Sequence, residues 1–368
     1  MQTEEKTGKA GPYFSKETTN IIKGVAIILM FFHHFWGFPN WILPEYGGSA
    51  YENLSFLRFP LKICVLIFCS LSGYFYYFSR KKTYSYSLQK IRSILTRYWV
   101  CLFLLGTIGV LFFHHSYDLP SVIKELCAIQ STTVLFNWYV AFYLVCMMLA
   151  PLLTRFLSRR PALEISVYFV ALPLLFQVLF ALIKVSFLPD LFLNCSNWLP
   201  AFYYGFLLAE YSVFEWIGEK FKKLVPNRIL QGLIAIIMLP VLTFLNAGSH
   251  IYFNITFDLN SLLILLDIII MPLELFFLIE ICKLIHAHSK IATGIFSALG
   301  KVSTLMWFLH SAFFNFERSF FQPLAYFSGV PIISVICGLI LTFVFAFILQ
   351  VLIERCETIF IRKSKRIS

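Results

Sequence analysis

Charged residues are scarce in this sequence. Asp, Glu, Lys and Arg make up 13% of the 368 residues, whereas hydrophobic residues make up 59%. An average soluble domain is about 25% charged and about 45–50% apolar, so a soluble domain of this length could not bury so much apolar side chain. Long apolar runs recur from Ile21 to Ile353. We therefore expect the lipid bilayer to surround most of the chain.

Motifs that would indicate several other functions are also missing. The nine cysteines form no CxxC pair and no zinc spacing, so no metal is predicted. No Gly-rich phosphate loop of the usual spacing occurs, and nothing indicates ATP. No cleavable signal peptide is evident, because the first apolar run contains two histidines and no small-residue cleavage site follows it. No internal repeat is visible, which weakens the case for a transporter built from two inverted halves.

The apolar segments predict an all-α bundle of ten transmembrane helices, each of which needs about 20 residues. The polar residues 1–19 and the basic residues 356–368 are predicted to be cytoplasmic tails, and residues 20–355 form the transmembrane domain. The ten predicted spans are approximately 20–38, 59–79, 96–113, 134–154, 164–184, 198–215, 229–246, 261–282, 302–317 and 331–353.

Lysine and arginine set the predicted orientation of these spans. With the N-terminus in the cytoplasm, 25 of the 30 Lys and Arg residues fall on inner segments. The five on the outer side are Arg58, Lys62, Lys124, Lys184 and Arg318. This excess follows the positive-inside rule and predicts that both termini are cytoplasmic. It also accounts for the net charge of +11 without a nucleic-acid partner.

The first predicted span carries ionisable groups, which are costly in a membrane and are therefore functional candidates. Lys23 and His34 are eleven positions apart, so they share one helix face about 16 Å apart along the axis. We expect Lys23 near the cytoplasmic boundary and His34 near mid-membrane, both facing one groove, with His33 in a supporting role. An imidazole there suits proton transfer from a hydroxyl. The alternative is a hydrogen-bonded structural His34 with Lys23 as a topological anchor.

Further motifs follow in chain order, and together they resemble those of a known family. They are Lys23-x10-His34, Phe68-x3-Ser72-Gly73-Tyr74, Asn137-Trp138-Tyr139 with Pro151-Leu-Leu, Phe202-x2-Gly205, and Leu299-Gly300-x2-Ser303 followed by His310. Their order and spacing resemble the acyltransferase-3 family, bacterial membrane acyltransferases that modify surface glycans. One departure is Arg97, which stands where the family usually has proline after a basic pair.

The resemblance implies an acyl-CoA donor, usually acetyl-CoA, that binds from the cytoplasm. Lys23, Lys90, Arg92 and Arg97 are then the candidates for holding its phosphates, because Arg and Lys bind phosphate well. His34 would act as general base on an acceptor hydroxyl or briefly carry the acyl group. The expected acceptor is a surface polysaccharide or its lipid-linked precursor, and among these we favour capsular or extracellular polysaccharide. The implied location is the bacterial cytoplasmic membrane.

Five further residues are candidates for lining the substrate cavity. Ser72 could carry an acyl group, although Ser72-Gly73 also suits close helix packing. His310 could line the cavity opposite His34 or bond a neighbouring helix. Asp267 and Glu274, seven positions apart, share one helix face and could orient a histidine or pair with a buried cation. Trp138 is included through its motif.

Two other functional classes fit the same pattern. A glycan or lipid transporter also needs many spans and an intramembrane cation, and it would translocate its cargo without using acyl-CoA. A non-catalytic membrane partner of a polysaccharide complex would tolerate replacement of both Lys23 and His34.

Overall fold

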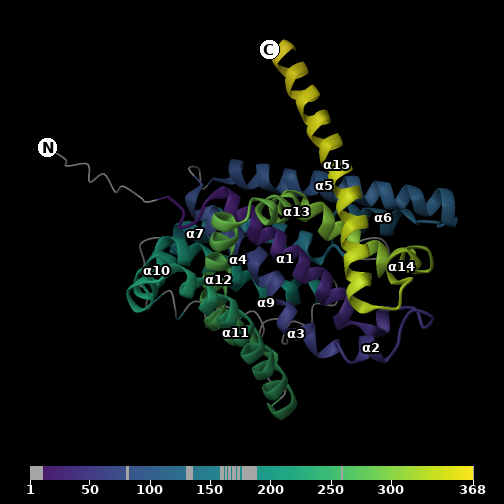
Figure 1. Ribbon diagram of the computed structural model, residues 1–368. Coiled ribbons are helices and arrows are strands. Elements are labelled where there is room, and N and C mark those ends of the chain that lie inside the picture. Colours follow the sequence, from purple (N-terminus) through teal and green to yellow (C-terminus); the bar gives the residue numbers. More distant parts are fainter. Residues whose placement is uncertain are drawn as a thin grey trace.

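The computed structural model describes residues 11–79, 83–129, 136–157, 189–257 and 260–367, together with positions 161, 164, 167, 171 and 175 (Figure 1). Within these ranges the chain is helical and contains no β-strand. The longer helices are α1 (Lys16–Gly37), α4 (Ile63–Phe78), α5 (Tyr84–Phe113), α6 (Leu119–Leu126), α7 (Trp138–Leu157), α9 (Pro189–Glu210), α10 (Val213–Leu224), α11 (Arg228–Phe257), α12 (Asn260–His288), α13 (Lys290–Leu309), α14 (Arg318–Tyr326) and α15 (Pro331–Ile367). The short ones are η1 (Pro39–Trp41), α2 (Ser49–Glu52), η2 (Ser55–Leu57), α3 (Arg58–Leu61) and η3 (His310–Phe313).

Seven helical segments in the described part are long and apolar enough to cross a membrane. They are Lys16–Gly37, Ser49–Phe78, Tyr84–Phe113, Trp138–Phe156, Arg228–Ser249, Lys290–Phe313 and Pro331–Ile359. A multi-pass membrane protein is thereby confirmed. The predicted spans 198–215 and 261–282 fall largely on α9 and α12, whereas the predicted span 164–184 lies outside the described residues except at positions 164, 167, 171 and 175. The total of ten spans and their orientation stay predictions.

The structure places several helix ends differently from the apolar pattern. α5 begins at Tyr84, not near residue 96, and the Thr83 hydroxyl accepts a hydrogen bond from the Tyr86 amide to cap it. α13 likewise begins at Lys290 behind the capping residue Ser289, and α15 continues through the basic residues to Ile367. Hydropathy detects only the apolar portion of such helices, whereas a side-chain cap fixes where the backbone turns helical. The basic segment before the third span is therefore helical from Tyr84 onward.

Glycines allow the central helices to approach closely. α1 lies in the middle of the bundle and packs along α13 (Figure 1). A Cβ atom at Gly24 would overlap the backbone oxygen of Phe296, and one at Gly300 would overlap that of Asn20. Close contact of this kind is how helices associate within membranes. α4 and α9 pack in the same way, through Gly73 and Gly205. Gly73, Gly205 and Gly300 each belong to a different sequence motif, so three of the motifs contain packing glycines.

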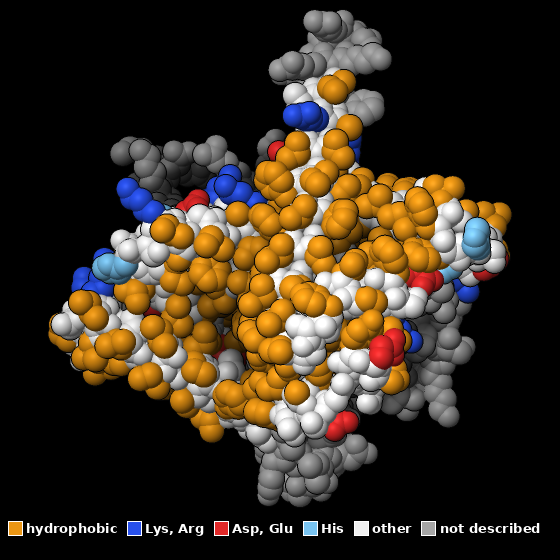
Figure 2. All heavy atoms as spheres, turned by 45° about the vertical axis from the view of Figure 1, so that its right-hand side comes forward, with side chains coloured by type: hydrophobic (Ala, Val, Ile, Leu, Met, Phe, Trp, Pro, Cys, Tyr) orange, Lys and Arg blue, Asp and Glu red, His pale blue; other side chains and the backbone are white. Residues whose placement is uncertain are grey.

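The outer surface of the bundle is mostly apolar. Figure 2 shows one face on which hydrophobic side chains cover the middle, with Lys and Arg at its margins. Large apolar side chains point outward from α11 and α15, among them Ile237 (61% exposed) and Phe345 (54% exposed). A soluble protein rarely exposes a contiguous patch of this kind. The surface thus fits a lipid environment.

Candidate active site

A cavity of about 300 Å³ lies among α1, α4, α5, α7 and α13. Four cationic side chains line it: Lys23 from α1, Lys90 and Arg97 from α5, and Lys301 from α13. No Asp or Glu is found among the described residues of this lining. Cations concentrated in a cleft with low-dielectric walls raise its positive potential and attract anions. The cavity is therefore suited to a ligand with several negative charges.

Helix geometry explains which residues of α5 reach this cavity. Lys90 and Arg97 are seven positions apart, so they lie two turns apart on one face. The Arg97 guanidinium donates hydrogen bonds to the Ser93 carbonyl (2.9 Å) and to the Ser93 hydroxyl (2.7 Å), which fixes its direction. Arg92 is about 200° around the helix from Lys90 and is exposed outside the lining. Of the predicted phosphate-binding residues, three line the cavity and Arg92 does not.

Lys301 is a cation that the sequence motifs did not single out. It lies inside the Leu299-Gly300-x2-Ser303 motif, where it adds to the predicted inner-side charge. Gly300 brings α13 against α1 at this point, and both Gly300 and Ser303 line the cavity beside Lys301. In the sequence, the signal for Lys301 as a cavity residue is its position directly after Gly300, the packing glycine of the motif. The structure thus adds a fourth cation to the cluster.

Ser72 lines the cavity, and its hydroxyl is engaged within its own helix. Ser72 Oγ donates to the Phe68 carbonyl at 2.8 Å, while a Cβ atom at the next residue, Gly73, would overlap the backbone oxygen of Phe202. The serine hydroxyl is also hydrogen-bonded to the Tyr139 side chain, and the glycine provides the contact between α4 and α9. The structure thus shows close helix packing at Gly73, and a role of Ser72 as acyl carrier stays a prediction.

His34 lies beyond the far end of this cavity, next to His310. The ring centroids of the two histidines are 4.7 Å apart. Trp307 connects the two regions, because it lines the cavity and its ring centroid is 6.3 Å from that of His310. Lys23 and His34 were predicted to face one groove. The structure places Lys23 in the cavity and His34, in the last turn of α1, outside its lining.

Backbone hydrogen bonds orient all three histidines in the same way. Nδ1 of His34 lies 3.1 Å from the Met30 carbonyl oxygen, and Nδ1 of His33 lies 2.8 Å from the Arg58 carbonyl oxygen. Nδ1 of His310 contacts the Trp307 carbonyl. Since a carbonyl can only accept, each Nδ1 carries the hydrogen and each neutral ring keeps a lone pair on Nε2. No described residue bonds the buried Nε2 of His310.

Four aromatic side chains surround His34 and form what we call the aromatic box: Phe38, Trp41, Phe136 and Phe314. Three of them lie nearly parallel to the imidazole, at interplanar angles of 18° for Phe38, 17° for Trp41 and 16° for Phe136. The box joins segments that are distant in sequence: the end of α1, η1, the residues before α7 and the residues after η3. From the sequence, Trp41 could equally belong to a lid or to an aromatic belt.

One buried glutamine joins Trp41 of the aromatic box to Phe313, the residue before Phe314 of the box. The Gln322 amide nitrogen donates to the carbonyls of Trp41 (2.7 Å) and Phe313 (2.8 Å). Its oxygen accepts from the Leu43 amide at 2.7 Å. Gln322 is fully buried, and a buried amide with both of its ends bonded fixes the groups that it bonds. It therefore connects η1 to η3, which begins at His310.

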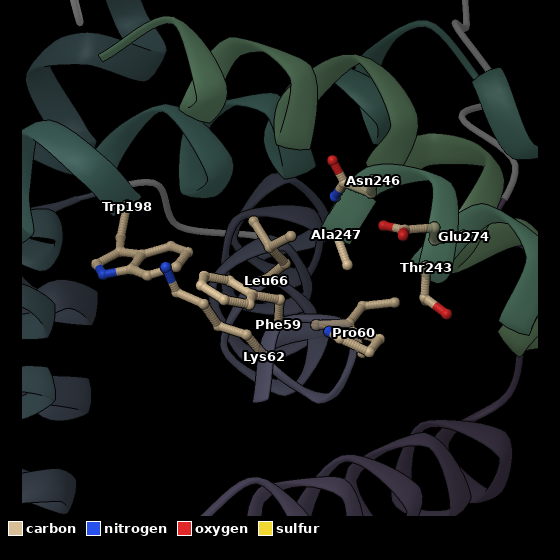
Figure 3. A pocket seen from close by; sticks show the side chains of 10 residues that line it. Phe59, Pro60, Lys62, Leu66, Trp198, Thr243, Asn246, Ala247 and Glu274 are labelled. Atoms are coloured by element: carbon tan, nitrogen blue, oxygen red, sulfur yellow. The ribbon is translucent and has the colours of Figure 1, made fainter. Parts of the chain in front are cut away.

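The remaining candidates lie elsewhere in the bundle. Glu274 is buried and lines a second, much smaller cavity of about 20 Å³, room for about one water molecule. Figure 3 shows Glu274, Thr243 and Asn246 at one side of it and Trp198 at the other. The Lys62 amine is 5.0 Å from the Trp198 ring centroid. Trp138 packs between Trp198 and Trp307. The side chain of Asp267 is outside the described part.

These elements agree with a comparison against known families. The family model described as an acyltransferase domain matches residues 19–351. The chain belongs to the acyltransferase-3 family. The family resemblance predicted from the motifs is thereby confirmed, and the matched range contains the basic cavity, the histidine pair and the aromatic box. Among curated proteins and among solved structures, no match to this membrane acyltransferase was found.

Proposed function

We propose that this acyltransferase is an O-acetyltransferase. It takes an acetyl group from cytoplasmic acetyl-CoA and transfers it to a hydroxyl of an extracytoplasmic polysaccharide, capsular or extracellular, or of its lipid-linked precursor. The observation that carries the proposal is the cluster of four cations in one cavity, separated from two histidines by a single tryptophan. Cations that can bind a polyanionic donor therefore lie close to histidines that can accept a proton.

The cationic cavity suits coenzyme A. Its phosphates are multiply charged, and the planar Arg97 guanidinium, held by Ser93, can bind a phosphate through two parallel hydrogen bonds. Lys23, Lys90 and Lys301 supply three more charges from α1, α5 and α13. With the N-terminus in the cytoplasm, this cluster belongs to the cytoplasmic half of α1 and His34 to the opposite half. The donor therefore enters from the inner side of the bacterial cytoplasmic membrane.

The histidines supply the acid–base chemistry. In direct transfer, His34 Nε2 removes the proton of the acceptor hydroxyl as its oxygen attacks the thioester carbonyl. The new C–O bond forms, the C–S bond breaks, and the coenzyme A sulfur leaves as thiolate and takes up the proton. In a carrier route, Nε2 attacks the thioester carbonyl, the C–S bond breaks, and coenzyme A leaves as thiolate. The acceptor hydroxyl oxygen then takes the acetyl group from Nε2, and the thiolate takes up the hydroxyl proton. His310, at 4.7 Å between ring centroids, is placed to exchange that proton.

Turnover of radiolabelled acetyl-CoA tests the proposal. Purified wild-type protein in nanodiscs is compared with His34→Ala and with the control His115→Ala, since His115 bonds Tyr117 and Glu317 away from the site. We expect saturable binding in all three proteins. Acetyl release or transfer should occur in wild type and His115→Ala and fall at least about 100-fold in His34→Ala.

The opposite results have equally direct meanings. Normal turnover by a correctly folded His34→Ala protein would refute the role of His34. Absence of acetyl-CoA binding in folded wild type would refute the donor and would favour glycan translocation, the transporter alternative that the family match does not support.

A further inference from the structure

Arg58 lies at the start of α3, against the end of α1 that carries the histidines. Its carbonyl oxygen accepts the hydrogen bond from His33 Nδ1 at 2.8 Å. A Cβ atom at Gly37 would lie 3.0 Å from Arg58 Cβ, so the two backbones are in close contact. These contacts with His33 and Gly37 fix the position of Arg58 relative to His34, the residue that follows His33.

The Arg58 guanidinium stacks on aromatic rings and has no carboxylate partner among the described residues. Its central carbon is 4.3 Å from the ring centroid of Phe38 and 5.8 Å from that of Phe59. No ion pair joins Arg58 to an acidic residue within the described part of the chain. Stacking uses the face of a guanidinium and leaves the N–H groups at its edge available. The exposed side chain is thus a prepared binding group for an oxyanion.

Phe38 connects this guanidinium to the chemistry. The Phe38 ring is 5.8 Å from the His34 ring and 4.1 Å from that of Trp41, nearly parallel to both. An anionic group bound at Arg58 is consequently held one aromatic ring away from His34. Arg58 is also one of only five Lys and Arg residues predicted on the outer side. A cation on the side where the positive-inside rule disfavours cations fits a binding role better than a topological one.

We propose that Arg58 binds an anionic group of the acceptor and that the acceptor is therefore an anionic glycan. The inference rests on the proposed function, which supplies the acceptor hydroxyl. Two sources offer the same oxyanion chemistry: the carboxylate of an acidic sugar, and the phosphate of a phosphorylated or lipid-linked sugar. A neutral sugar would leave the guanidinium unpaired. Arg58 selects the acceptor, and His34 acts on its hydroxyl.

Competition in native membranes tests the inference, because the natural acceptor is present there. Transfer of radiolabelled acetyl groups to membrane material is measured with glucuronate, glucose 1-phosphate or glucose as competitor. The proteins are wild type, Arg58→Gln, Arg58→Lys and the control Arg318→Gln, an exposed outer-side arginine at the start of α14. Glucuronate alone as inhibitor identifies a carboxylate acceptor, and glucose 1-phosphate alone identifies a phosphate acceptor.

We expect Arg58→Gln to lower transfer at limiting acceptor about tenfold to 100-fold, the size of effect of a lost hydrogen bond to a charged group. Arg58→Lys should retain part of the activity, since lysine keeps the charge and loses the bidentate geometry. Arg318→Gln should match wild type. The KM for acetyl-CoA should be unchanged in all three variants. Equal inhibition by glucose and by the two anions, or full transfer by Arg58→Gln, would overturn the inference.

Direct binding separates this inference from the proposed function. The same three sugars are titrated into purified wild type, Arg58→Gln and Arg318→Gln without acetyl-CoA, so that no acyl transfer is required. Binding of an anionic sugar that is lost only in Arg58→Gln supports the anion site even if acetyl-CoA is not a substrate. Binding that is equal in all three proteins refutes the site while acetyl-CoA turnover remains intact.

Discussion

At the scale of single residues, the proposed donor binding and the proposed proton transfer depend on different side chains. Lys23 and His34 are about 16 Å apart along α1, and only Lys23 lines the basic cavity. The histidines use backbone carbonyls to hold Nδ1, so they need no carboxylate to set their tautomer. Substitutions in the two groups should therefore have separable effects, one on binding and one on turnover.

The basic cavity yields a prediction with an internal control. Lys301→Gln should weaken acetyl-CoA binding about tenfold, because a charge-assisted contact to phosphate is lost. Arg92→Gln should bind as wild type does, since Arg92 is exposed outside the lining. Equilibrium binding of radiolabelled acetyl-CoA to the purified variants measures both. Equal weakening in the two variants would show that general charge, and not the cavity, holds the donor.

The sequence predicted the site residues unevenly, and the reason is physical. Lys23 was a candidate because a charged side chain in a span is costly to keep unless it binds or pairs with something. Lys90 and Arg97 were candidates because the family resemblance implies a donor with phosphates. Trp41, Phe136, Gln322 and Arg58 could not be predicted, because they come from short or irregular segments whose contacts no periodicity encodes. Glu274 was predicted on the strength of its charge, and the structure places it in a cavity away from the histidines.

At the scale of elements, helix type and order follow from apolar runs, whereas helix ends depend on single capping residues. Thr83 and Ser289 each start a helix well before its apolar part begins. α6 could not be predicted either, because its eight residues lie within a predicted outer loop and are too few to form a transmembrane span. It turns back along α5, where the Tyr98 hydroxyl donates to the Glu125 carbonyl at 2.6 Å.

Two glycines on α13 give a matched test of close packing. Gly300→Ala should lower the free energy of unfolding by about 1–3 kcal/mol, because the new methyl group must displace the backbone of α1 at Asn20. Gly294→Ala should be neutral or stabilise by up to about 1 kcal/mol, since open space surrounds Gly294 and alanine favours helix. Melting temperatures of both variants in the same detergent provide the measurement. A similar melting temperature for both would contradict the role of Gly300.

Gln322 is predicted to be a positioning residue for the histidine pair. Gln322→Leu removes three hydrogen bonds, to Trp41 in η1, to Leu43 just after η1 and to Phe313 in η3. Trp41 and His310 should therefore lose their fixed relation. We expect kcat to fall about tenfold or more while acetyl-CoA binds unchanged. Gln350→Leu, on the distant α15, is the control for loss of a glutamine. A fall in donor affinity equal to the fall in kcat would indicate a general structural defect instead.

At the scale of the whole molecule, orientation decides which face meets the donor. Glu45 lies in the exposed segment between η1 and α2, and Cys356 lies exposed near the end of α15. The charge distribution predicts that Glu45 lies outside and Cys356 inside. In a Cys127→Ser background, which removes the other exposed cysteine of the chain, a membrane-impermeant maleimide should label Glu45→Cys in intact cells. Cys356 should react only after permeabilisation. Labelling of Cys356 in intact cells would show that the orientation is the reverse of the predicted one. The basic cavity would then face away from the cytoplasmic pool of acetyl-CoA, and the proposed donor would have no access to its site.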